Sequence, residues 1–117
     1  MQYLLLIYAS EAEMAKLKEP AMLEMTRDYG EFTKAIVQSG NFKAGDRLRP
    51  VSTATTVRIR DGKTVLTDGP FAETREQLGG YYLIEAKDLD EATAIAARIP
   101  GAKTGSIEVR PVWPTQR

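Results

Sequence analysis

QYLLLIY, residues Gln2 to Tyr8, is an apolar run with no polar alternation. Unbroken runs of this kind are typical of strands covered on both faces, whereas a strand with one wet face alternates. YYLIEA, residues Tyr81 to Ala86, is a second predicted strand, and its first four residues, Tyr81 to Ile84, have the same character. The first run is too short to cross a bilayer, and it lacks the basic residues that precede the apolar part of a secretory signal. We therefore expect a cytosolic protein whose central strands need cover on both faces.

Two amphipathic segments can supply part of that cover. In the first, Pro20 suits an opening helical turn, and Ser39-Gly40-Asn41 provides a stop. Apolar side chains recur between them at spacings of three and four residues, on one helical stripe: Met22, Met25, Tyr29, Phe32 and Ile36. The second begins at Asp88, which resembles a capping box with Glu91. Its predicted buried face is Ala92, Ile95, Ala96 and Ile99.

The middle of the chain predicts a β-hairpin. TTVRIR (Thr55 to Arg60) and KTVLT (Lys63 to Thr67) are β-prone runs on either side of Asp61-Gly62, a dipeptide that favours a type I′ turn. RLRP (Arg47 to Pro50) is a short extended piece before the hairpin, and SIEVRPV (Ser106 to Val112) alternates as a last strand. With the hairpin counted as an addition, residues 1–117 form one α+β domain. Its expected fold is a ferredoxin-like βαββαβ antiparallel sheet with both helices on one face.

Two helices on one face leave the other face of this sheet bare. Because the central strands are apolar on both sides, a bare face would be an association site. A homodimer that packs sheet against sheet, and so forms a dimeric α/β barrel, is the simplest cover. The facing sheets would also enclose a pocket for a small molecule.

The amino-acid composition restricts the chemistry. The chain has no cysteine and no histidine, which removes thiolate and imidazole groups as nucleophiles, general bases and metal ligands. No metal site or cofactor is predicted. Sixteen basic residues balance sixteen acidic ones, so no net field draws the protein to nucleic acid or to a membrane. An enzyme stays open, but its chemistry would have to come from the other polar side chains or a bound cofactor.

Asp68 is the candidate catalytic residue. A two-residue turn pairs Thr55 with Asp68 and sorts the hairpin side chains onto two faces. One face carries Val57, Ile59, Leu66 and Asp68, and the other carries Arg58, Arg60, Lys63 and Val65. In the structural account, the Asp68 carboxylate accepts backbone N–H groups in an Asx-turn. In the functional account, it is a partly desolvated acid or base at the mouth of a pocket. The two accounts are compatible.

Five further residues are predicted to line the pocket: Tyr8, Phe71, Tyr81, Arg47 and Arg49. Tyrosine hydroxyls can point into a cavity, although tyrosines in strands more often pack with only the polar tip wet. The two arginines suit a carboxylate or phosphate ligand. For the two arginines we favour the alternative, in which their side chains lie on a solvent-exposed face of the sheet and bind no ligand.

DGPFAETREQLGGYYLIE, Asp68 to Glu85, resembles the signature of the DGPF branch of the YCII-related superfamily. DLDEA (Asp88 to Ala92), the last strand and the opening MQYLLLIY also fit, so the likeness spans essentially the whole chain. The resemblance implies a ferredoxin-like dimeric α/β barrel in a small bacterial cytosolic protein. Some members are associated with extracytoplasmic-function sigma factors. Some YCII relatives carry a His–Asp pair proposed to be catalytic, but this chain has no histidine, so only Asp68 is left as a family-supported candidate.

Three functions follow from these observations. The first is a dimer that binds a small molecule in a sheet-lined pocket, in a regulatory or stress context. The second is an enzyme in which Asp68 acts as general acid or base on a small substrate. The third, which rests on the resemblance alone, is an interaction partner of a sigma factor.

Overall fold

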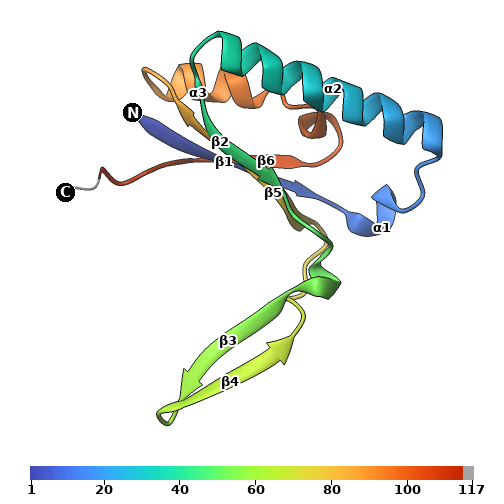
Figure 1. Ribbon diagram of the computed structural model, residues 1–117, viewed down its shortest axis with the longest axis vertical. Helices are drawn as coiled ribbons and strands as arrows, with labels where there is room; N and C mark the ends of the chain where they lie inside the picture. The colour runs from blue at the N-terminus through green and yellow to red at the C-terminus, as the bar shows by residue number, and fades with distance from the viewer. Residues whose placement is uncertain (115–117) are drawn as a thin grey trace.

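The computed structural model describes residues 1–114 as an α+β protein built on a four-stranded antiparallel sheet (Figure 1). The strands lie in the order β2 (Phe42–Arg47), β5 (Gln77–Glu85), β1 (Gln2–Ala9) and β6 (Ser106–Pro111). The two strands with unbroken apolar runs, β1 and β5, are therefore the central pair. This strand order, with both long helices on one face, is the ferredoxin-like arrangement that the sequence predicts.

Helix α2 (Glu19–Gln38) lies across the sheet, with Pro20 in its first turn and Ser39 as its C-cap. Its buried side chains are Phe32 and Ile36. Both belong to the predicted apolar stripe, so the periodicity of the sequence identified the buried face of this helix correctly. The stripe continues toward the start of the helix, where its side chains are less well covered.

Helix α3 (Leu89–Ala96) begins at the predicted cap. The Asp88 carboxylate accepts the Glu91 N–H at 2.9 Å, and the Glu91 carboxylate accepts the Lys87 N–H at 3.1 Å. The side chains of α3 join those of α2 and the central strands in one core: Tyr3, Leu5, Phe32, Ile36, Tyr82, Ile84, Ala86, Ala92, Ile95, Ala96 and Ile99. The core thus lies between the helices and one face of the sheet.

The predicted hairpin forms a separate two-stranded sheet of β3 (Thr55–Arg60) and β4 (Lys63–Asp68). Asp61 and Gly62 have φ values of 52° and 74°, and two positive φ angles in succession define the type I′ turn. Residues pair from Thr55 opposite Asp68 to Arg60 opposite Lys63. The predicted turn and register are therefore confirmed.

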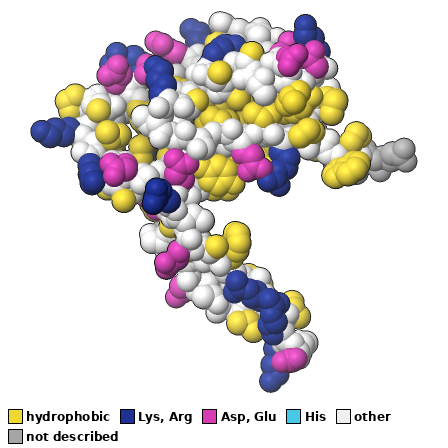
Figure 2. Space-filling model, turned by 180° about the vertical axis from the view of Figure 1, so that it is seen from behind, with side chains coloured by type: hydrophobic (Ala, Val, Ile, Leu, Met, Phe, Trp, Pro, Cys, Tyr) yellow, Lys and Arg dark blue, Asp and Glu magenta, His cyan; other side chains and the backbone are white. Residues whose placement is uncertain are grey.

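This hairpin, residues 55–68, is called the arm below. It projects from the main body on the side away from α2 and α3, and Figure 2 shows it standing clear of the body. Every residue of β4 is exposed. Within residues 1–114 the arm strands pair only with each other, so no strand of the main sheet supports them.

Two elements differ from the prediction. The second strand is Phe42–Arg47 and not Arg47–Pro50. Its sequence, FKAGDR, includes residues with low β-propensity, and it becomes a strand because β5 supplies its hydrogen-bond partners. A short helix, α1 (Glu11–Met14), also follows β1, where the sequence predicted none; Ser10 caps it by accepting the Glu13 N–H at 3.2 Å.

The sheet face opposite the helices carries the side chains that alternate with the core residues. Leu4 and Leu6 of β1 pair with Leu83 and Tyr81 of β5, and all four are half-buried. These four residues are called the open face below. The sheet closes no barrel within residues 1–114, so the dimeric barrel stays a prediction.

Two 3₁₀ turns, Val51–Thr53 and Pro100–Lys103, complete the elements of the described chain. No helix within residues 1–114 combines the length and apolar character needed to cross a membrane.

Candidate functional site

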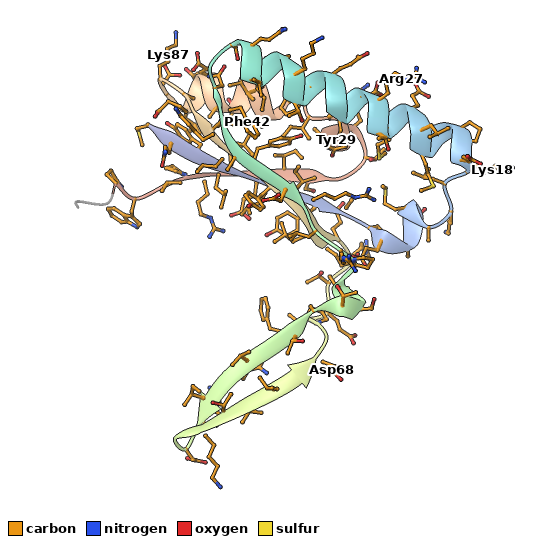
Figure 3. The ribbon with its side chains drawn as sticks, viewed as in Figure 1. Lys18, Arg27, Tyr29, Phe42, Asp68 and Lys87 are labelled. Carbon is orange, nitrogen blue, oxygen red and sulfur yellow. The ribbon has the colours of Figure 1, made fainter. Side chains whose placement is uncertain are left out.

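A cleft of about 770 Å³ opens between the N-terminal half of α2 and the sheet. Its helix side consists of Met22, Met25, Thr26, Tyr29 and Thr33. Its sheet side consists of Ile7, Ala9, Phe42, Gly45, Gly79, Gly80, Tyr81 and Tyr82. The α1 region and the ends of β2 and β5 supply Glu11, Met14, Ala15, Leu17, Asp46, Arg47, Leu48, Pro50 and Gln77. Figure 3 shows Tyr29, from α2, and Phe42, from β2, in the layer between the helix and the sheet.

The cleft exists because α2 is longer than the part of it that the core covers. The helix has 20 residues, and a helix of that length extends about 30 Å. Phe32 and Ile36 are buried in its C-terminal half, whereas Met22 near its start is 50% exposed. Helix α3 has only eight residues and packs beside the other end of α2. The N-terminal half of α2 therefore overhangs the sheet without a matching helix.

Glycines keep side chains off the floor of the cleft. A Cβ at Gly45 would lie 2.7 Å from the Tyr82 ring, and a Cβ at Gly80 would lie 3.1 Å from the Asp46 carbonyl oxygen. Neither position therefore accepts a larger residue without movement. The register of β1 and β5 shifts at Gly79, which forms a β-bulge. Bulges commonly bend a strand beside a functional site.

Tyr29 lines the cleft and carries a hydroxyl group. Its oxygen accepts the Gly101 N–H at 3.1 Å, and a Cβ at position 101 would lie 2.5 Å from that oxygen, so the approach requires glycine. Burial raises the pKa of Tyr29 above 10.0, and the Gly101 hydrogen bond and the Arg47 charge oppose this rise only in part. Tyr29 is therefore a neutral phenol at pH 7. Its hydroxyl proton has no acceptor within residues 1–114, which leaves it available to a ligand.

Two further hydroxyl groups meet between the helix side and the sheet side of the cleft. Thr33 Oγ1 and Tyr82 Oη are 2.6 Å apart, and this hydrogen bond joins α2 to β5. The Phe32 ring packs edge-on against the Tyr82 ring, with centroids 5.2 Å apart. These contacts hold the inner wall of the cleft in place.

Neither acidic residue beside the cleft offers a free carboxylate to it. Glu11 Oε2 accepts the Val51 N–H at 3.0 Å, which ties α1 to the linker before the arm. Asp46 pairs with Tyr81 on the other face of the sheet, where it accepts the Tyr81 hydroxyl at 2.7 Å, and this hydrogen bond raises the pKa of Tyr81. Arg47 supplies a cation to the cleft. Residues 1–114 contain no cluster of three or more side chains suited to hold a metal ion.

The structure brings some of the predicted pocket residues together. Arg47 lines the cleft. Tyr81 also borders it, but the Tyr81 side chain lies on the open face of the sheet. Arg49 lines a smaller hollow of about 260 Å³, which it shares with Arg47. Tyr8 is half-buried in β1, and Phe71, just after the arm, is 80% exposed. Tyr8 and Phe71 therefore lie apart from the cleft in the single chain.

Asp68 lies at the end of β4, exposed to solvent and apart from the cleft (Figure 3). It shares a face with the apolar side chains of the arm, as predicted, but that face borders no cavity in one chain because the arm projects into solvent. The exit from β4 is held by other groups. The Gly69 N–H donates to the Ala54 carbonyl at 2.7 Å, and the Thr56 hydroxyl donates to the Gly69 carbonyl at 2.9 Å. The expected Asx-turn is thus replaced by bonds without the carboxylate, and a chemical role for Asp68 stays a prediction.

Sequence reasoning missed the cleft residues of α2. Met25 and Tyr29 lie in the apolar stripe and were predicted to be core, because the stripe alone does not show where the sheet beneath the helix ends. One signal was present in the sequence. Tyr29 is the only member of the stripe with a polar tip, and buried tyrosine hydroxyls usually have a hydrogen-bond partner.

Comparison with known proteins identifies the family. The family model of the YCII-related domain matches residues 1–116, which includes both the cleft and the arm. Uncharacterized protein R00369 of Rhizobium meliloti (strain 1021) is 39% identical over 114 residues, which cover 96% of this chain and 92% of that protein. The chain belongs to the YCII-related domain family.

Proposed function

We propose that this protein is a cytosolic homodimer that binds a small, mainly apolar molecule in the cleft beside α2. The cleft volume of about 770 Å³ falls within the range of ligand sites, roughly 300–1,000 Å³. The observation that carries the proposal is the Tyr29 hydroxyl. Its oxygen is held by Gly101 at 3.1 Å, and Tyr29 lines a space whose other walls are mostly aliphatic and aromatic.

The lining supports an adaptable pocket. Three of the four methionines in the chain, Met14, Met22 and Met25, line the cleft. Methionine side chains are unbranched and polarisable, so they adjust to ligands of different shape. This composition favours a ligand with a flexible or irregular apolar body over a compact polar metabolite.

The polar groups define one end of that ligand. The neutral Tyr29 phenol can donate to an oxygen acceptor such as a carbonyl or carboxylate. The Arg47 guanidinium acts on the same region, since its charge lowers the pKa of Tyr29 against the effect of burial. A ligand with an apolar body and an oxygen-bearing, neutral or anionic end therefore fits best.

The acid–base groups of the cleft favour binding over catalysis. Glu11 accepts a hydrogen bond from the protein itself, the Asp46 carboxylate is bonded to Tyr81 on the other face of the sheet, and the raised pKa of Tyr29 keeps it protonated at neutral pH. No observation here favours the enzyme with Asp68 as its acid or base, or the sigma factor as partner.

The open face supports the homodimer. Its four residues form the centre of the sheet, and no layer within residues 1–114 covers them. Around them, Glu108 and Arg110 of β6 form an ion pair with each other. An apolar centre with a polar rim is the usual composition of a protein interface.

Two tryptophan substitutions on neighbouring residues test the cleft. Thr26 lines it, whereas Arg27 points away from it (Figure 3). In Thr26→Trp the indole should fill the cleft, and in Arg27→Trp it should lie in solvent. The probe is 1-anilinonaphthalene-8-sulfonate, an apolar anionic dye, excited directly and followed by its fluorescence.

We expect the dye to bind the wild type and Arg27→Trp alike, and to bind Thr26→Trp at least about tenfold more weakly because the indole occupies its volume. Amide chemical shifts of Met25, Tyr29 and Gly101 should move when the dye binds. Equal binding by all three proteins, or shift changes confined to other residues, would refute the cleft as the site.

A further inference from the structure

The arm has an apolar face that the single chain leaves in water. Val57, Ile59 and Leu66 lie on one face of the hairpin and are 60%, 59% and 66% exposed. An isolated two-stranded hairpin is at best marginally stable in water, because it needs a third strand or a packing surface to cover its apolar face. This arm has neither within residues 1–114. It therefore requires a surface on another molecule.

The size of the exposed surface indicates what that molecule is. The solvent-accessible surface is 8802 Å² for a 13.0 kDa chain, whereas a compact monomer of this mass exposes about 6,300 Å². The radius of gyration is 16.3 Å, against about 13 Å for a compact chain of this length. The excess of roughly 2,500 Å² is what one subunit of a large, obligate homodimer buries.

We infer that the arm packs its apolar face, Val57, Ile59 and Leu66, against a second copy of this chain. The arm leaves the body on the side away from the helices, which is also the side of the open face (Figure 1). A twofold-related copy that covers the open face lies within reach of the arm. Twofold symmetry then makes the contact reciprocal, so each subunit holds the other with its arm.

The opposite face of the arm fits this orientation. Arg58, Arg60 and Lys63 lie there, and Figure 2 shows the basic side chains gathered along the arm. Charged side chains on that face keep it in water and discourage pairing with unrelated strands. The arm thus offers one face to a partner and one face to solvent.

The inference also places the family-supported carboxylate. Asp68 lies on the same face as Leu66, two residues along β4. When the apolar face of the arm packs against the second subunit, Asp68 is therefore brought to the surface of that subunit. Any site that uses this carboxylate would be shared between subunits.

The inference rests on the homodimer of the proposed function but goes beyond it, and the test separates the two. Leu66 and Val65 are neighbours in β4 with side chains on opposite faces. Leu66→Lys places a charge on the packed face, and Val65→Lys places the same charge on the solvent face. Both residues lie outside the core, so both variants should fold.

Sedimentation equilibrium over a range of protein concentrations gives the dimer dissociation constant of each protein. We expect Leu66→Lys to raise it by about tenfold or more, since a charge at a packed centre is poorly tolerated, and Val65→Lys to change it less than about threefold. A dimer that Leu66→Lys leaves unchanged would overturn the arm contact while the homodimer stands. A wild type that stays monomeric would overturn both.

Hydrogen exchange of the arm amides supplies a second, variant-free measurement. The amides of β3 and β4 should be protected in the wild-type dimer and lose protection on dilution to the monomer, while the core amides of β1 and β5 stay protected. Arm amides that remain protected in the monomer would show that the hairpin is stable alone, which contradicts the inference.

Discussion

The hydroxyl groups of Thr33 and Tyr82 lie 2.6 Å apart and join α2 to the centre of the sheet. Thr33→Val should leave the mostly buried Tyr82 hydroxyl without its partner. We expect a loss of about 1–3 kcal/mol in the free energy of unfolding, measured by urea denaturation. Adding Tyr82→Phe removes the orphaned hydroxyl and should recover part of that loss. A double variant as unstable as the sum of the single ones would show that the two hydroxyls do not act as a pair.

Two glycine-to-alanine substitutions should have opposite effects. A Cβ at Gly101 would lie 2.5 Å from the Tyr29 hydroxyl oxygen, whereas a Cβ at Gly30 meets no atom within 4 Å. Gly101→Ala should therefore break the hydrogen bond to Tyr29 and cost about 1–3 kcal/mol of stability. Gly30→Ala lies inside α2 and should stabilise the protein by about 0.5–1 kcal/mol. Thermal unfolding of both variants measures this, and two changes of the same sign would contradict the geometry.

Tyr29 gives the protein an alkaline pH dependence. Its pKa is raised above 10.0, mainly by burial. When the pKa of a group is higher in the folded state than in the unfolded state, its contribution to stability is fully present below the unfolded-state pKa. That contribution is lost as the pH rises from there through the folded-state pKa. Urea unfolding at a series of alkaline pH values should therefore show a decline in stability that begins near the ordinary tyrosine pKa of about 10. Tyr29→Phe should flatten that decline.

The matched control for this measurement is Tyr81→Phe. The pKa of Tyr81 is also raised, first by its hydrogen bond to Asp46, but this group lies in solvent. Water screens exposed charges, so Tyr81→Phe should alter the decline less than Tyr29→Phe. A larger effect from Tyr81→Phe would mean that burial of Tyr29 is not the dominant cause.

Asp68→Ala should leave the folding of the single chain almost unchanged, within about 0.5 kcal/mol, because the carboxylate is exposed and the β4 exit is held by other groups. Gly69→Ala should cost about 1 kcal/mol or more, since Gly69 has a φ of 95° that alanine adopts with strain. Urea unfolding below the dimer dissociation constant checks both values. A large loss from Asp68→Ala under these conditions would restore the turn-forming account.

Local patterns predicted the parts of the fold that depend on neighbouring residues. The Asp61-Gly62 turn set the pairing of the arm, and Asp88 with Glu91 marked the start of α3; both signals lie within four residues. Strand β2 was misplaced because FKAGDR has little intrinsic β-propensity and takes its strand geometry from β5, far along the chain.

The candidate site was harder to predict than the fold. Its central contact joins Tyr29 to Gly101, 72 residues apart, and the cleft depends on how far α2 extends beyond the sheet. Neither relationship has a local signature. Arg47 was predicted as a cation for a carboxylate or phosphate ligand, and it lines the cleft. Tyr8, Phe71 and Tyr81 were predicted for a pocket between two facing sheets, and their role there stays a prediction.

The linker between β2 and the arm borders the cleft and is also bonded to α1. Leu48 and Pro50 line the cleft, Val51 is tied to Glu11 of α1 at 3.0 Å, and the arm begins four residues later at Thr55. A ligand that moves this wall therefore also moves the base of the arm. If the arm packs against a second subunit, ligand binding and subunit association are coupled by one interaction free energy. Each process then changes the affinity of the other by the same factor. The apparent ligand affinity is then expected to change with protein concentration.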